Sequence, residues 1–100
     1  RDSSSASIAA CGMLEMSKYL EPEEAGHYRK IASRIMKSVY DNYAVKDMEA
    51  SNGLVLHSTY SNHSPYNTCN HYGVDECNSW GDYFYMEALT RMSRDWELYW

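Results

Sequence analysis

The chain has 100 residues, a net charge of -5 and 44% hydrophobic residues, among them ten Tyr and three Trp. This length allows one domain at most. The mean hydropathy is -0.65, and no segment approaches the roughly 20 apolar residues of a membrane span, which argues against a membrane role. Residues 51–100 hold only two basic residues, and nucleic-acid binding requires clustered cations.

The cysteines bear on the cellular compartment, and the first residues bear on whether the chain is part of a longer one. Three Cys, at positions 11, 69 and 77, are an odd number and do not form a disulfide framework, which favours a reducing, cytoplasmic setting. The sequence opens with Arg1 in place of Met and has no basic region followed by an apolar segment, as a signal peptide would have. We expect a piece of a longer polypeptide or an incomplete gene product.

The first predicted helix runs from about Ser4 to Tyr19. Asp2 and the serines that follow it are N-cap candidates. Apolar residues recur at the three- and four-residue spacing of an amphipathic helix, which predicts the buried stripe Ala6, Ala9, Met13, Met16 and Leu20.

The second predicted helix runs from about Pro22 to Tyr43. Pro22 suits a first helical position, and Glu23 and Glu24 suit the positive end of the helix dipole. Charged residues line one side, with Lys37 and Asp41 at pairing distance. We expect an outer helix, exposed on one side, with the apolar stripe Tyr28, Ala32, Ile35, Val39 and Tyr43.

The third predicted helix, about Gly81 to Ser93, follows a long irregular segment, about 44–79. So long a connection is usually functional. Ser79 and Asp82 form a variant of the capping box, and Glu87 is placed to pair with Arg91. The predicted buried residues are Tyr85, Leu89, Met92 and Trp96 on one stripe, and Phe84 and Ala88 on another.

Two kinds of chemistry in the irregular segment receive little support. Metal donors are present at His63, Cys69, His71 and Cys77, without the paired C-x-x-C or H-x-x-x-H spacing common in zinc sites. A nucleophilic system of Ser58, His57 and Asp75 lacks the G-x-S-x-G elbow. We therefore predict neither a metal site nor a nucleophilic system here.

Four segments carry a family resemblance. They are R-D-S-S-S-A-S-I-A-A-C-G-M-L-E-M at the start, G-L-V-L-H-S-T-Y, Y-G-V-D-E-C-N-S-W-G-D-Y-F-Y-M-E-A-L, and D-W-E-L-Y-W at the end. In this order they resemble the C-terminal part of the unsaturated glucuronyl hydrolases, glycoside hydrolase family 88. The resemblance implies an all-α fold: residues 1–100 would be the last helical hairpins of a single (α/α)6 toroid, with a long loop before the final helix.

The resemblance also implies a reaction and a set of substrate contacts. Such enzymes hydrate the double bond of a 4,5-unsaturated uronic acid at the non-reducing end of glycosaminoglycan oligosaccharides, using carboxylates without a cofactor. The family's catalytic Asp residues lie upstream, so no residue here is assigned as catalytic and the chain alone should be inactive. The expected substrate-binding residues are Tyr60, Ser58, His57, Asp2, Asp82 and Trp80.

Each of these residues also has a structural reading. Asp2 and Asp82 suit helix caps, Ser58 and His57 suit a partly buried loop, and Trp80 suits a core. If the first and third helices are both inner helices, their N-termini share one end, and Asp2, Tyr60 and Asp82 converge there.

Two alternatives to this function stay open. One is a fragment of the related unsaturated rhamnogalacturonyl hydrolases, which act on pectin. The other is a non-catalytic helical fragment that self-associates through exposed apolar faces.

Overall fold

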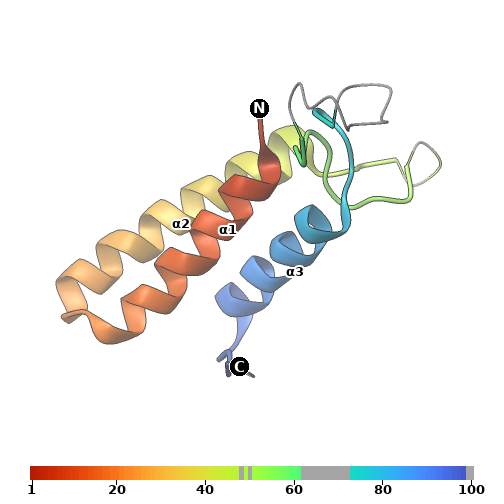
Figure 1. Cartoon of the computed structure of the whole chain (residues 1–100). Helices are drawn as coiled ribbons and strands as arrows, with labels where there is room; N and C mark the ends of the chain where they lie inside the picture. Colours follow the sequence, from red (N-terminus) through yellow and green to blue (C-terminus); the bar gives the residue numbers. More distant parts are fainter. Residues whose placement is uncertain (48, 50, 62–72, 99–100) are drawn as a thin grey trace.

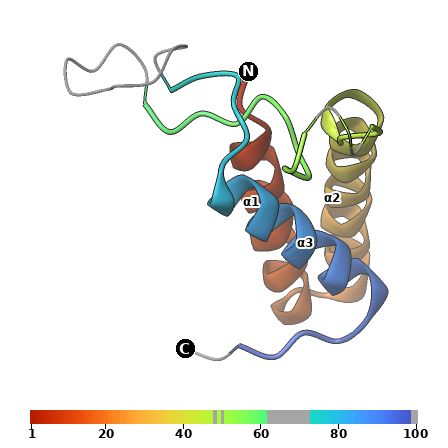
Figure 2. The same cartoon turned by 90° about the vertical axis from the view of Figure 1, so that its right-hand side faces the viewer.

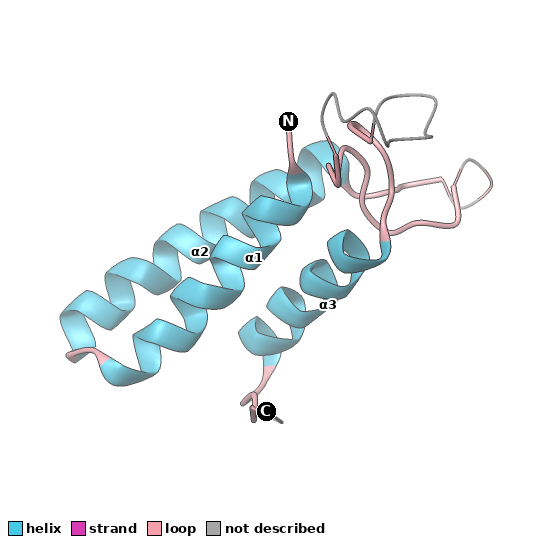
Figure 3. Cartoon of the chain, in the orientation of Figure 1, coloured by secondary structure: helices cyan, strands magenta, loops and turns pink. Residues whose placement is uncertain are grey.

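The structure is a computed structural model that describes residues 1–47, 49, 51–61 and 73–98. The helices are α1 (Ser3–Met16), a short 3₁₀ helix η1 (Ser17–Tyr19), α2 (Pro22–Tyr43) and α3 (Ser79–Ser93) (Figure 1). Within the described ranges there is no strand, and only two isolated β-bridges occur (Figure 3). The expected all-α class is confirmed.

The helices form one hairpin and one further helix beside it. α1 and α2 run antiparallel, and α3 lies along α1 in the same direction (Figures 1 and 2). α1 packs against both neighbours, whereas α2 and α3 touch each other little. The N-terminal ends of α1 and α3 consequently share one end of the molecule, as predicted, and residues 54–60, from the connection between α2 and α3, lie at that end.

The helix starts follow their capping residues. Asp2 caps α1 by accepting from the backbone N–H groups of Ser4 and Ser5, and Pro22 opens α2 at the expected position. α3 begins at Ser79, two residues before the predicted start, because the Asn78 side chain accepts from the Gly81 N–H at 2.7 Å. The capping box expected from Ser79 and Asp82 is therefore wrong.

The core lies where α1 meets its two neighbours. It contains Ala10, Cys11, Ala32, Met36, Val39, Val55, Tyr85 and Ala88. The predicted α1 stripe is partly wrong, because Ala9 and Met16 are exposed while Ser3 and Ser7 are buried. Those serines are buried with hydrogen bonds to backbone carbonyls, which hydrophobic periodicity does not register.

The exposed surfaces of α2 and α3 differ in character. α2 exposes charged residues such as Glu23, Lys30 and Arg34, as an outer helix should. On α3, Leu89 and Met92, predicted as buried, are 37% and 43% exposed. No helix within the described ranges is long and apolar enough to cross a membrane.

Candidate functional site

Residues 54–60 connect the N-terminal ends of α1 and α3. Thr59 donates its backbone N–H to the Asp2 carboxylate at 3.3 Å, and Ser3 donates its own to the His57 carbonyl at 3.0 Å. From the other side, Asp82 accepts from Leu54. The predicted convergence of Asp2, Tyr60 and Asp82 at one end is thus present, arranged around this short stretch of loop.

Asp2 holds the start of α1 and the loop together. One carboxylate oxygen accepts from the N–H and hydroxyl of Ser4, at 3.1 and 2.6 Å, and the other from the Ser5 hydroxyl at 2.5 Å. Burial opposes ionisation of Asp2, but the hydrogen bonds from Ser4, Ser5 and Thr59 outweigh it and lower its pKa. Asp2 is consequently an ionised cap at pH 7.

Asp82, a residue of α3, holds the loop by accepting hydrogen bonds from it. Its Oδ1 atom accepts from the backbone N–H groups of Leu54 and Val55, at 2.9 and 3.1 Å. Val55 is 1% exposed and belongs to the core. The two bonded residues lie 28 and 27 positions before Asp82 in the sequence. Asp82 therefore holds the loop in position and does not act as a helix cap.

Ser58 lies inside the assembly of loop and helices. It is 0% exposed, its hydroxyl is 3.1 Å from that of Ser3, and its backbone pairs with Glu76 in both directions. A Cβ atom at Gly81 would overlap the Ser58 hydroxyl. In this structure Ser58 therefore contacts protein on all sides, which favours its structural reading.

His57 pairs with Asp75 at the surface of the same end. Its Nδ1 lies 2.8 Å from a carboxylate oxygen of Asp75, and both residues adopt left-handed φ angles, 61° and 58°. The hydrogen bond to His57 lowers the pKa of Asp75. Since the Ser58 hydroxyl bonds to Ser3 instead, the structure gives no support to a Ser58, His57 and Asp75 nucleophilic system.

Tyr60 and Trp80 form an aromatic pair on the outside of this end. Their ring centroids are 5.9 Å apart and their planes meet at 88°. The residues are 42% and 39% exposed, so each ring presents apolar surface. The backbone N–H of Tyr60 donates to Gly73 at 2.8 Å, which fixes the residue against the segment that leads into α3.

The sequence analysis did not identify the Asn78 cap or the pair of His57 and Asp75 at this end. Asn78, the α3 cap, was detectable as an Asn directly before a helical pattern. Asp75 was considered only as part of a nucleophilic system, and its pairing with His57 depends on two left-handed residues that the sequence does not mark.

Most of the possible metal donors that the sequence offers lie outside the described residues. His63, Cys69 and His71 lie outside the described residues. Cys77 is a free thiol, 3.5 Å from the Ser51 hydroxyl. In the part of the chain that the structure describes, no group of three or more His, Cys, Asp or Glu residues is placed to hold a metal ion.

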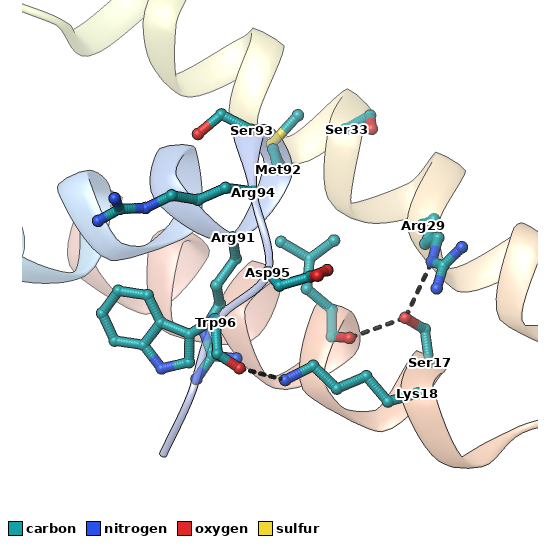
Figure 4. Close-up of a pocket in the computed structure, with 11 residues that line it drawn as sticks. Ser17, Lys18, Arg29, Ser33, Arg91, Met92, Ser93, Arg94, Asp95 and Trp96 are labelled. Carbon is teal, nitrogen blue, oxygen red and sulfur yellow. Dashed lines mark hydrogen bonds between the residues drawn. The ribbon is translucent and has the colours of Figure 1, made fainter. Parts of the chain in front are cut away.

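A cavity of about 440 Å³ lies at the opposite ends of α1 and α3 (Figure 4). Its lining includes four cationic residues: Lys18, Arg29, Arg91 and Arg94. Lys18 bonds to Glu15 and to the Trp96 carbonyl, and Arg29 donates to the Ser17 hydroxyl at 3.2 Å. Lys18 thereby holds the segment after α3 near the C-terminal, negative ends of α1 and α3.

Arg91 is the buried centre of that network. It bonds to Glu15 at 2.5 Å and to Glu87 at 2.8 Å, confirming the predicted pair with Glu87. Its guanidinium lies 4.9 Å from the centre of the Trp96 ring. Trp96 thus packs back onto α3 through Arg91.

Comparisons with known proteins cover the whole chain. No protein-family model matches it. It is 42% identical, over 100% of its residues, to 24% of an unsaturated chondroitin disaccharide hydrolase from Streptococcus agalactiae. The crystal structure of an unsaturated glucuronyl hydrolase mutant from the same species matches with a TM-score of 0.84, over 100% of this chain and 25% of that one.

A second solved structure agrees. The unsaturated glucuronyl hydrolase of Bacillus sp. GL1, described as responsible for the degradation of glycosaminoglycan, is 31% identical with a TM-score of 0.76. The alignment covers 94% of this chain and 24% of that one. These hydrolases are α/α toroids, and the chain spans about a quarter of their length. Over its whole length the chain is therefore the counterpart of one segment of the unsaturated glucuronyl hydrolases, as its sequence predicts.

Proposed function

We propose that residues 1–100 are the C-terminal portion of a single (α/α)6 domain that hydrates 4,5-unsaturated uronic acids at the non-reducing end of glycosaminoglycan oligosaccharides. The observation that carries the proposal is the 42% identity over the whole chain to a chondroitin disaccharide hydrolase. In this reaction an Asp protonates the ring carbon, water adds to the neighbouring carbon, and the hemiketal opens to release the sugar. That Asp lies outside this chain.

The substrate would meet this chain at the shared N-terminal ends of α1 and α3. The exposed rings of Tyr60 and Trp80 offer apolar surface to a sugar ring. His57, with 29% of its side chain exposed, offers hydrogen bonds beside them. Asp2 and Asp82, whose carboxylates bind backbone N–H groups, would hold the loop in position, as would Ser58.

An anionic sugar also needs positive charge, and the described part of this end offers little: Lys46, which follows α2, lies over the Tyr40 ring. Arg1 lies near enough to help lower the pKa of Asp75. The four cations of the cavity lie at the other end of the helices (Figure 4). We therefore expect the cation that binds the carboxylate to come from outside this chain.

A hybrid enzyme tests this function. This chain would replace the matching quarter of the Streptococcus agalactiae hydrolase, and turnover of an unsaturated chondroitin disaccharide would be followed as loss of ultraviolet absorbance. The hybrid is expected to be active and the isolated chain inactive, because the catalytic Asp comes from the rest of the enzyme. A folded hybrid without turnover would contradict the proposal, as would turnover by the isolated chain.

The remaining alternatives have separate tests. An unsaturated rhamnogalacturonyl substrate would be preferred by the hybrid if the chain belonged to the pectin-degrading group. Self-association of the isolated chain would appear as a mass that rises with concentration.

Cys11 and Cys77, both free thiols, suit a reducing cytoplasmic compartment.

A further inference from the structure

The side chains of His57 and Asp75 meet at the end of the molecule that also carries Tyr60. Nδ1 of His57 lies 2.8 Å from Oδ1 of Asp75. Both residues have left-handed φ angles, which residues other than Gly adopt at a cost in free energy. The neighbouring backbones are already joined, since Ser58 and Glu76 exchange two hydrogen bonds. Loop closure alone therefore does not account for the strained pair of side chains.

The hydrogen bond between them determines which nitrogen of the His57 ring carries the hydrogen. Hydrogen bonding to His57 lowers the pKa of Asp75, so its carboxylate is ionised at pH 7 and can only accept. Nδ1 of His57 must then carry a hydrogen, and Nε2 of the neutral ring is an acceptor. Among the described residues Nε2 has no hydrogen-bond partner, and 29% of the side chain is exposed.

The ring is held from three parts of the chain. Ser3 of α1 donates its backbone N–H to the His57 carbonyl at 3.0 Å. Tyr43, at the end of α2, packs against the ring with centroids 5.4 Å apart and planes at 70°. Asp75, before α3, holds Nδ1, and Arg1 acts on Asp75 by its charge. These contacts fix the direction of Nε2, and Tyr43 and Asp75 are the titratable groups that face the ring.

We propose that Asp75 is a positioning residue for the reaction, because it holds His57 in the tautomer that presents Nε2 as an acceptor for a sugar hydroxyl. This inference rests on the proposed function, which brings the sugar to the shared N-terminal ends of α1 and α3. Without the carboxylate, a neutral imidazole favours the hydrogen on Nε2 and would donate there instead.

Nitrogen-15 NMR of the histidine rings tests the tautomer in this chain at about pH 8, where an ordinary His is neutral. Asp75→Gly removes the carboxylate and suits the left-handed φ, so the fold is preserved. We expect the hydrogen on Nδ1 of His57 in the wild type and on Nε2 in Asp75→Gly. His57→Asn assigns the signals. The matched control is Asp41→Asn, at the exposed pair with Lys37, and should keep the wild-type pattern. A wild-type ring with its hydrogen on Nε2 overturns the inference.

The role in the reaction is tested in the hybrid with the Streptococcus agalactiae hydrolase. At about pH 8, Asp75→Gly should lower kcat/KM for the unsaturated chondroitin disaccharide about three- to tenfold, the effect of one hydrogen bond. The ratio of the unaltered hybrid to the variant should shrink toward about pH 5, because the protonated ring donates from Nε2 in both proteins. A purely structural ion pair would strengthen in acid and give the opposite trend.

The outcomes separate this inference from the proposed function. An active hybrid that is insensitive to Asp75→Gly overturns the inference and leaves the function in place, as does a ratio that grows toward acid. A folded hybrid without turnover contradicts the proposed function, and the inference is overturned with it.

Discussion

At the scale of single residues, Asp82 joins the core to the loop. Replacing it with Ala removes the acceptor for the N–H groups of Leu54 and Val55, which are 2.9 and 3.1 Å from its Oδ1. Unpaired, partly buried donors of this kind cost about 1–3 kcal/mol each. We expect Asp82→Ala to lower the free energy of unfolding by at least that much in urea titrations of the isolated chain.

The control is another Asp that pairs at the surface. Asp41 on α2 bonds to Lys37 with both side chains well exposed, so Asp41→Ala should change the free energy of unfolding by less than about 1 kcal/mol. Equal effects of the two substitutions would show that the loop is not held by Asp82.

Gly81 is the second residue on which the loop depends. An Ala Cβ at this position would overlap the Ser58 hydroxyl and lie 2.9 Å from the Asn78 side-chain oxygen. Because Ser58 is completely buried, it has no room to move, and we expect Gly81→Ala to destabilise by about 1–3 kcal/mol.

Gly26 provides the matched comparison, since a Cβ there meets nothing within 4 Å. Gly26→Ala in α2 should stabilise by about 0.5–1 kcal/mol through helix propensity. Thermal unfolding of both variants checks the pair. A stabilising Gly81→Ala would mean that the loop sits farther from α3 than the structure places it.

At the scale of the elements, the start of α1 is a pH-dependent feature. Hydrogen bonds lower the pKa of Asp2 against the opposing effect of burial. A carboxylate with a lowered folded-state pKa stabilises the fold above its unfolded pKa of about 3.9 and loses this effect as the pH falls through the folded value. The free energy of unfolding should therefore decrease in acid, partly because Asp2 becomes protonated.

Asp2→Asn isolates this contribution, because Asn also caps helices but does not titrate. The difference in free energy of unfolding between wild type and variant should be largest near pH 7 and should shrink below about pH 4. Urea titrations at several pH values measure it. A difference independent of pH would contradict the ionised cap.

The helices differ in how far their sequence predicts them. Both ends of α2 agree with the prediction. Pro22 marks its start, and the separation of charged from apolar residues indicates the same helix. The start of α3 is misplaced because Asn78, which caps it, lies outside the apolar pattern. The buried side of α1 is misjudged because serines at positions 3 and 7 are buried by hydrogen bonding, whereas periodicity detects only apolar residues.

At the scale of the whole molecule, the convergence of α1 and α3 was predictable, and the detail of the loop was not. Two helices that run in the same direction place Asp2, Tyr60 and Asp82 at one end, and the structure has them there. The burial of Ser58 depends on contacts with Ser3 and Gly81, more than 20 residues away in sequence. Such contacts leave no local pattern.

The most direct measurement compares the two ends of the helices in the active hybrid. Tyr60→Ala removes an exposed ring at the proposed sugar-facing end, whereas Arg29→Ala removes a cation from the opposite cavity. We predict that Tyr60→Ala lowers kcat/KM for an unsaturated chondroitin disaccharide about tenfold, equivalent to roughly 1.4 kcal/mol, and that Arg29→Ala leaves it unchanged. The reverse result, with Arg29→Ala impaired and Tyr60→Ala unaffected, would contradict the assignment of the substrate to the shared N-terminal ends of α1 and α3.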